Sequence, residues 1–269
     1  MKCLQKIGAI AVTLLLTVPV TIAAQTMPAV AKPFFSPATQ ASATRAVNTK
    51  VSHIDYSARY PGLFIVHGPR TERKVALTFD DGPDLFITPQ VLTVLRRENV
   101  KATFFLVGLR VHDYPGIVRR IAAEGHAIGN HTWDHRELPK LGLDALKSEA
   151  NRTDAEIYRS VGIHPALIRP PYGSVNGPVI ETLAHMGYRV VDWNVDSSDW
   201  RGLGRLQVEQ NVLSNVHNGS IILQHSGGAS RKLNGTVEAL PDIIRELRAR
   251  GYQFVTVPEL LHLPAAFIK

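Results

Sequence analysis

Short apolar runs alternate with amphipathic stretches from about residue 62 of this 269-residue chain onward. Eight of the runs have the length and residue types of β-strands, and they cover residues 62–66, 74–79, 102–107, 127–130, 166–169, 189–193, 220–224 and 253–257. Four stretches between them carry apolar residues at helical spacing, over residues 113–125, 143–161, 179–187 and 237–251. The second helix is expected to have Asp144 as its N-cap, and the last is expected to close at Gly251.

The order of these elements predicts the fold class. Strand–helix alternation with apolar strands is typical of an α/β protein whose mainly parallel sheet is covered by helices. Eight strands favour a closed or nearly closed barrel, with the helices outside, over an open sheet. In either form catalytic groups gather at the carboxyl ends of the strands, so polar clusters at these positions are candidates for a site.

The first residues have a different pattern. Lys2 and Lys6 precede an uncharged apolar run from Ile7 to about Ala24, and small residues follow, which predicts a secretory signal peptide over residues 1–31. An uncleaved membrane anchor is the alternative, because the run of 18 residues is just long enough to cross a bilayer. Residues 32–61 are rich in Ala, Thr, Ser and Pro and are predicted to be a linker or extension, so the catalytic domain is predicted over residues 62–269.

Composition narrows the chemistry. The single cysteine, Cys3, lies in the predicted leader, so neither a disulfide framework nor thiolate chemistry is expected, and any metal ligands must be His, Asp or Glu. Loss of Lys2 and Lys6 with the leader would lower the net charge from +7 to +5. A basic exported protein associates readily with anionic wall polymers or membrane surfaces. Nucleic-acid binding is not expected, since the Lys and Arg residues are scattered.

Two adjacent carboxylates follow the strand predicted over residues 74–79. Asp80 and Asp81 stand before the turn residues Gly82 and Pro83, which would let both side chains face one site. Two acids held close together repel each other, so the pair needs a cation or a shared proton. Taken alone, the segment is more typical of a solvated turn.

A pair of histidines follows the strand predicted over residues 127–130. His131 and His135 are four residues apart, a spacing that suits one side of a helical turn or a loop ligand pair. Either alone would be interpreted as a surface histidine. With one carboxylate from Asp80 or Asp81 they complete a two-His, one-Asp set, which in zinc sites leaves a position open for water and substrate.

The strand predicted over residues 166–169 ends in Arg169, followed by two prolines and Tyr172. The prolines would stiffen the loop and fix the Tyr172 backbone N–H, which could donate to an oxyanion. Arg169 can pair bidentately with a carboxylate and hold it ionised. A rigid loop with a surface arginine is the alternative.

Two further clusters stand after predicted strands. Asp196, Asp199 and Trp200 follow Trp193, and together they predict either a sugar-binding wall or a capped loop with one buried ring. His225 ends the strand predicted over residues 220–224, where an imidazole could protonate a leaving amine. A lone histidine in such a position is more often structural.

The five motifs stand in a characteristic order: TFDDG at 78–82, HTxxH at 131–135, RPPYG at 169–173, DxxDW at 196–200 and LxH at 223–225. In this order the chain resembles the polysaccharide deacetylases of carbohydrate esterase family 4, also called NodB-homology domains. The resemblance covers about residues 73–260, and no functional position of the motifs is substituted.

The resemblance implies a distorted (β/α) barrel and one divalent metal, usually zinc and sometimes cobalt or another divalent ion. It also implies a role for each motif residue. Asp80 would be the general base, oriented by Arg169, and the metal ligands would be Asp81, His131 and His135. His225 would be the general acid, with Asp199 as the carboxylate that tunes its pKa, and the Tyr172 backbone N–H would donate to the oxyanion. The substrate contacts would be Pro171, Tyr172, Trp200 and Leu223.

The predicted function is therefore hydrolysis of N-acetyl groups on an N-acetylglucosamine-type polysaccharide by a secreted or wall-associated monomer. Peptidoglycan is the preferred polymer for an exported basic protein, and chitin or chito-oligosaccharide remains an alternative. Removal of O-acetyl groups from xylan is a second alternative, because that leaving group needs less acid assistance. A wall-binding protein without activity would be expected to have lost motif residues, and a metalloprotease would be expected to carry an HExxH helix, which the sequence lacks.

Overall fold

The structure is a computed structural model of the chain, and it describes residues 54–228 and 232–267. The predicted leader over residues 1–31, Cys3 within it, and the predicted linker as far as residue 53 lie outside the described residues. Within the described ranges, every helix is too short or too polar to cross a bilayer.

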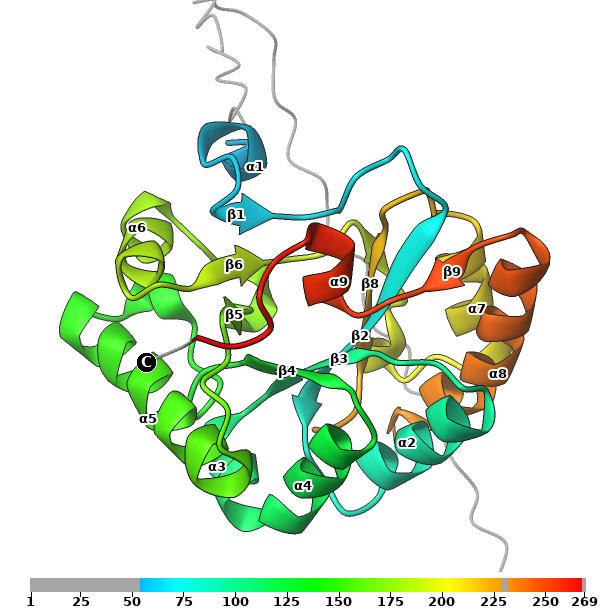
Figure 1. Ribbon diagram of the computed structural model, residues 1–269, viewed down its shortest axis with the longest axis horizontal. Coiled ribbons are helices and arrows are strands. Elements are labelled where there is room, and N and C mark those ends of the chain that lie inside the picture. The colour runs from blue at the N-terminus through cyan, green and yellow to red at the C-terminus, as the bar shows by residue number, and fades with distance from the viewer. Residues whose placement is uncertain (1–53, 229–231, 268–269) are drawn as a thin grey trace, which may run out of the picture. The chain divides into compact units, whose positions relative to one another are not determined.

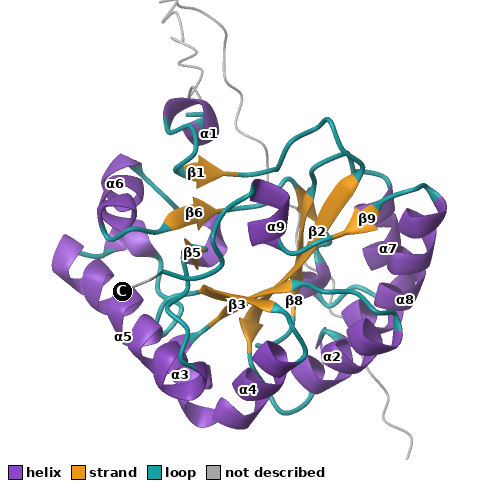
Figure 2. Ribbon diagram, viewed as in Figure 1, coloured by secondary structure: helices purple, strands orange, loops and turns teal. Residues whose placement is uncertain are grey.

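A parallel sheet forms the centre of the domain, in the order β1-β6-β5-β4-β3-β2-β8-β7, with β9 pairing on β2 (Figures 1 and 2). Every ladder between these strands is parallel. The strands are β1 (Phe64–Ile65), β2 (Lys74–Gly82), β3 (Thr103–Leu106), β4 (Ala127–Asn130), β5 (Leu167–Ile168), β6 (Arg189–Val191), β7 (Val195–Asp196), β8 (Ile221–His225) and β9 (Gln253–Phe254). An antiparallel bridge from His67 to Ser220 links the segments beside β1 and β8. The sheet is thus a distorted, nearly closed barrel, which confirms the predicted fold class.

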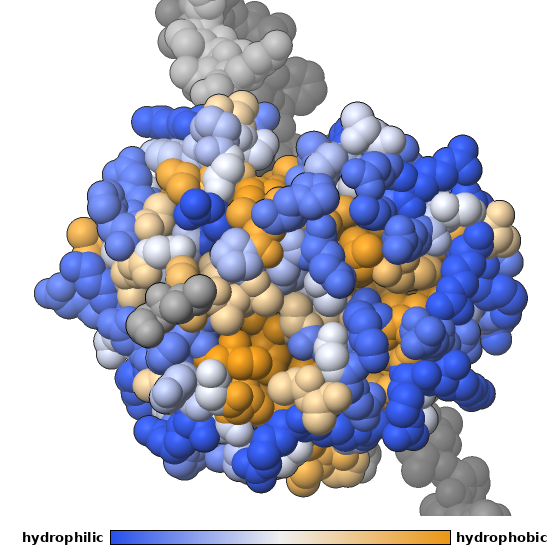
Figure 3. All heavy atoms as spheres, viewed as in Figure 1, coloured by the Kyte–Doolittle hydropathy of each residue, from blue (hydrophilic) through white to orange (hydrophobic). Residues whose placement is uncertain are grey.

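The helices of the described residues are α1 (Tyr56–Arg59), α2 (Ile87–Arg97), α3 (Gly108–Asp113), α4 (Pro115–Ala123), α5 (Leu143–Val161), α6 (Gly177–His185), α7 (Arg205–Leu213), α8 (Asn234–Ala249) and α9 (Val257–Leu261). In Figure 2 they lie around the sheet, except for α9, which lies over its middle. Short 3₁₀ turns η1 (Leu138–Lys140), η2 (Pro171–Gly173) and η3 (Asp199–Arg201) lie in the loops. Figure 3 shows hydrophilic side chains along the rim of the viewed face, as expected where amphipathic helices turn their polar sides to solvent.

Strand β2 is buried on both of its faces. Leu77 and Phe79 belong to the large apolar cluster shared with the outer helices. Ala76 belongs to a smaller cluster with Val257 and Leu260 of α9, so α9 fills the amino-terminal end of the barrel interior. Because both faces are covered, this strand reads as an almost continuous apolar run until it reaches Asp80.

The eight predicted strands are all present, with shorter bounds at most ends, and β7 is an additional strand of two residues. The helix predicted over residues 113–125 begins at Pro115, because Tyr114 separates it from α3. The predicted N-cap Asp144 is wrong. Helix α5 begins at Leu143 with Gly142 as its N-cap, two residues before Asp144, and Asp144 lies in the first turn, where a negative charge is favoured by the free N–H groups. Gly251 has a φ of +83° and closes α8 as predicted.

The predicted domain boundary at residue 62 is too late. Tyr56 and Tyr60 pack against the apolar cluster that contains Phe64, and the Tyr60 hydroxyl donates to Glu181 Oε1 over 2.8 Å. Helix α1 therefore belongs to the folded domain, although its sequence was assigned to the linker. Tyr56 and Tyr60, four residues apart, are the sequence pattern that indicates this helix.

The Phe79→Ala variant tests the core that carries the end of β2. The Phe79 ring is fully buried and stacks on Phe104 with 5.2 Å between centroids, so we expect a loss of about 3–5 kcal/mol in the free energy of unfolding, measured by denaturant titration. The control Leu206→Ala removes a side chain that is 74% exposed and should change stability by less than about 0.5 kcal/mol. Equal losses in both variants would contradict the assigned core.

Candidate active site

The carboxyl end of β2 brings two carboxylates to one side. Asp81 adopts a left-handed conformation with φ of +66°, and the register with β3 shifts between Phe79 and Gly82. This turn of the backbone lets Asp80 and Asp81 face the same site, against the alternation of a regular strand. Gly227 packs directly on the Asp81 carbonyl, where a Cβ atom would clash. The segment after β8 therefore locks this conformation in place.

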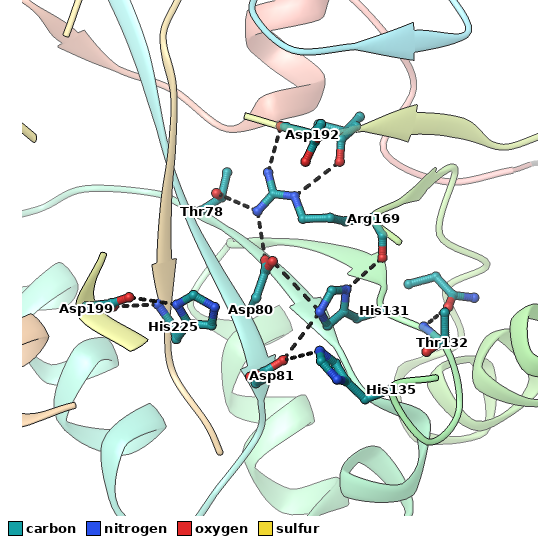
Figure 4. A network of polar contacts seen from close by, with 12 residues as sticks. Thr78, Asp80, Asp81, His131, Thr132, His135, Arg169, Asp192, Asp199 and His225 are labelled. Atoms are coloured by element: carbon teal, nitrogen blue, oxygen red, sulfur yellow. Dashed lines mark hydrogen bonds and ion pairs between the residues drawn. The ribbon is translucent and has the colours of Figure 1, made fainter. Parts of the chain in front are cut away.

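Asp81, His131 and His135 converge on one point (Figure 4). Asp81 Oδ1 lies 3.1 Å from His135 Nε2 and 3.4 Å from His131 Nε2. The three potential ligand atoms all lie within 4.8 Å of one another. The two histidines stand in a loop, not on a helix, and His135 has a φ of +64°.

This set fits a divalent metal. Asp81 Oδ1 is buried and accepts no well-directed hydrogen bond within the described part of the chain. His131 Nδ1 donates to the Arg169 carbonyl over 2.7 Å, which leaves Nε2 as the nitrogen that faces the site. Two imidazoles and one carboxylate are a common zinc set, with a fourth position open to water and substrate.

The electrostatics of the site also favour a cation. Burial alone would raise the pKa of Asp81, but the contacts and charges of His131 and His135 outweigh it and hold the pKa well below its usual value. Burial likewise lowers the pKa of His131, but Asp80 and Asp81 outweigh this effect and raise it. Two carboxylates therefore attract positive charge to the point where the imidazole nitrogens meet.

Asp80 is paired with a buried arginine. Arg169 Nη1 donates to Asp80 Oδ1 over 2.7 Å and to Thr78 Oγ1 over 2.8 Å, and the arginine is 0% exposed. The other guanidinium nitrogens donate to the Val191 and Asp192 carbonyls. The expected bidentate pair is not formed, because the fork of donors is divided between the carboxylate and backbone carbonyls. Asp80 Oδ2 is thus left facing His131 Nε2, 3.8 Å away.

His225 and Asp199 form a second polar pair. His225 Nδ1 donates to Asp199 Oδ1 over 2.7 Å, and its backbone N–H donates to Oδ2 over 2.8 Å. Burial alone would lower the pKa of His225, but Asp199, Asp80 and Asp81 outweigh it and raise the pKa to about 9. The imidazole is therefore protonated at neutral pH, as a proton donor must be.

These residues surround one cavity of about 500 Å³. Its lining residues are Asp80, Asp81, His131, His135, Tyr172, Trp193, Asp196, Trp200, Leu223 and His225. Eight of the predicted site residues are thus in its wall, while Arg169, Pro171 and Asp199 are buried outside it. Tyr172 lies on the turn η2 with a φ of +62°, and its ring meets His135 edge-on at 4.7 Å.

Three residues that were not predicted hydrogen-bond to Arg169 and Asp199 from outside the cavity. The hydroxyl of Thr78 and the carbonyl of Asp192 hold the guanidinium of Arg169. Thr236 donates to Asp199 Oδ2 over 2.6 Å from the first turn of α8. Thr78 stands inside the TFDDG motif and could have been noted, but no pattern connects Thr236 with Asp199.

The sequence profile of the polysaccharide deacetylases matches residues 67–191. A peptidoglycan-N-acetylglucosamine deacetylase of Bacillus cereus is 44% identical over 193 residues, which are 72% of this chain and 70% of that protein. The peptidoglycan-N-acetylmuramic acid deacetylase PdaA of Bacillus subtilis is 34% identical over 207 residues, 76% of each chain. Among solved structures, a peptidoglycan N-acetylglucosamine deacetylase superposes with a TM-score of 0.77 at 40% identity, over 80% of this chain and all of that one.

The chain therefore belongs to the polysaccharide deacetylase family, carbohydrate esterase family 4. The predicted family and the predicted enzyme class are confirmed. The fold of that family, a distorted barrel of parallel strands, is the fold found here.

His131→Ala tests the metal set. If this set holds the metal, removal of the buried imidazole should lower the zinc retained after zinc loading and dialysis, measured by atomic emission, from about one ion per chain to a small fraction of that. The control His112→Ala replaces a histidine whose side chain is 63% exposed and which lies outside the set, and it should keep the metal. Full zinc content in His131→Ala would rule out this set.

Proposed function

We propose that this enzyme removes N-acetyl groups from N-acetylglucosamine residues of peptidoglycan in a metal-dependent reaction. The observation that carries the proposal is the arrangement in one cavity of three residues able to hold a metal, a carboxylate oxygen of Asp80 that faces them, and an imidazole, His225, whose pKa is raised. The names of the similar Bacillus enzymes support peptidoglycan as the polymer.

Asp80 would act as general base. Its Oδ1 is held by Arg169, and its Oδ2 faces the metal set, within reach of a water molecule that attacks there. Arg169 is fully buried and bound by four acceptors, so it fixes the direction of the carboxylate. A base held in one orientation loses little entropy when it takes the water's proton.

Asp81, His131 and His135 would hold the metal, for which we propose zinc, with cobalt or another divalent ion as the alternative. When bound, such an ion lowers the pKa of water and polarises the acetyl carbonyl. The Tyr172 backbone N–H would donate to the oxyanion that develops on that carbonyl. The rigid turn around Pro171 would keep this donor in place.

His225 would protonate the leaving amine. An amine departs readily only when it takes up a proton, and the imidazole is charged because Asp199 stabilises that form. The Nδ1–H bond to Asp199 leaves Nε2 as the proton donor on the cavity side. Trp200 and Leu223 would line the acetyl group, and Leu223 is only 3% exposed at the end of this pocket.

We also propose that the domain works outside the cytoplasm as a secreted or wall-associated monomer. The layout of residues 1–31, as a cleaved leader or as an uncleaved anchor, supports export. The positive charge would favour retention at anionic wall polymers.

Acetate release from defined polymers tests the function. The purified zinc-loaded enzyme should release acetate from peptidoglycan, less from chitin oligomers and least from acetylxylan, and a chelator should stop the release.

Asp80→Asn should lower kcat at least about a hundredfold while the metal content stays unchanged, because only the base is lost. Faster release from chitin oligomers would reassign the polymer, and an active Asp80→Asn variant would remove the proposed base.

The pH dependence tests the acid. Because the pKa of His225 is raised to about 9, its proton is present at neutral pH, and kcat for N-acetyl substrates should fall as the pH rises through about 9. His225→Gln should not show this decrease of kcat at high pH, and it should be about a hundredfold slower at neutral pH. His185→Gln, at an exposed position on α6, is the matched control and should keep the decrease of kcat at high pH. If kcat still decreased near pH 9 in His225→Gln, the group that protonates the leaving amine would be another residue.

A further inference from the structure

Thr236 stands in the first turn of α8, outside every sequence motif of the site. Its hydroxyl donates to Asp199 Oδ2 over 2.6 Å, and its side chain is completely buried. We infer that Thr236 is a positioning residue that fixes the Asp199 carboxylate and, through it, the orientation of the His225 imidazole. This inference rests on the proposed function, in which His225 delivers a proton to the leaving amine.

The two oxygens of Asp199 have different partners. Oδ1 accepts from His225 Nδ1 over 2.7 Å, whereas Oδ2 accepts from the His225 backbone N–H and from Thr236 Oγ1. Two donors on Oδ2 set the plane of the carboxylate. Oδ1 is thereby placed to accept the hydrogen bond from the imidazole Nδ1–H.

Asp199 is not fixed by its own element. It begins the short turn η3, between Ser198 and Gly202, which have φ of +55° and +76°. Such a turn does not determine the side-chain torsion angles of the aspartate. The hydroxyl of Thr236 reaches it from a different element, the sixteen-residue helix α8.

Helix α8 itself is closely fitted at this point. Gly235 packs against the Leu203 carbonyl, and a Cβ atom at residue 235 would clash with that oxygen. The neighbouring residue Thr236 is therefore held by backbone packing as well as by its helix. A donor held in this way adds little motion to the carboxylate that it binds.

The consequence is specific to reactions that need a proton. Without the hydroxyl, the buried Oδ2 keeps only the His225 backbone N–H of its two donors, so the carboxylate is held less firmly against Nδ1. His225 Nε2 would then point toward the leaving amine for a smaller fraction of the time. Hydrolysis of an ester with a good leaving group, such as 4-nitrophenyl acetate, needs no such proton and should be insensitive to this loss.

The experiment compares Thr236→Val, which keeps the side-chain shape, with Thr236→Ser, which keeps the hydroxyl. Both are measured as zinc-loaded full-length protein on N-acetylglucosamine oligomers and on 4-nitrophenyl acetate. Thr103→Val is the matched control, because it removes another fully buried hydroxyl, the acceptor of the Val257 N–H at the opposite end of the barrel.

We expect Thr236→Val to lower kcat on the N-acetyl substrate about tenfold with KM unchanged, and to change 4-nitrophenyl acetate hydrolysis less than about twofold. Thr236→Ser and Thr103→Val should resemble the parent enzyme on both substrates. Unchanged kcat in Thr236→Val, or equal losses on both substrates, would overturn the inference.

An NMR measurement separates this inference from the proposed function. The parent protein should show a low-field resonance from the His225 Nδ1 proton that is absent in His225→Gln and weakened in Thr236→Val. If the parent released no acetate from any N-acetyl sugar, the proposed function would fail, while this signal would still report on Thr236. An unaltered signal in Thr236→Val would refute the positioning role.

Discussion

Repulsion between two neighbouring carboxylates is the constraint on which the rest of the site depends. Asp80 and Asp81 leave β2 on the same side because the backbone turns at Asp81, and each needs a separate source of positive charge. Arg169 supplies it for Asp80 from within the barrel. Among the described residues, Asp81 meets two imidazoles, which are suited to share a metal with it. In the proposed reaction, this division assigns one carboxylate as a metal ligand and the other as the general base.

The barrel solves the problem of bringing these groups together. His131 follows β4, Arg169 follows β5, and His225 ends β8, so residues far apart in sequence meet at the carboxyl edge of one sheet. Hydrogen bonds on the side away from the cavity then orient the two imidazoles: the Arg169 carbonyl accepts from His131, and Asp199 accepts from His225. The catalytic wall and its supporting layer are thus continuous with the core, which allows the orientation of each side chain to be held without substrate.

The sequence predicted the parallel strands well because each is a nearly uninterrupted apolar run. It did not predict α7, whose buried residues are only Val208 and Val212, or β7, in which Val195 alone is buried. Helix α2 was overlooked although Val91, Leu92 and Leu95 trace a clear stripe. The lining residues were largely predictable because they stand in motifs at strand ends. Thr236 was not, because it is 37 residues from Asp199 in sequence, and the contact between them depends on how α8 packs and not on any local pattern.

We propose that one divalent ion binds between Asp81 Oδ1 and the Nε2 atoms of His131 and His135. A crystal of the zinc-loaded protein, with diffraction recorded above and below the zinc absorption edge, tests it most directly. We expect a single strong anomalous peak at ligand distance, about 2.0–2.3 Å, from all three atoms. A peak bound by other residues, or a site in which one of these three side chains points away from the ion, would contradict it.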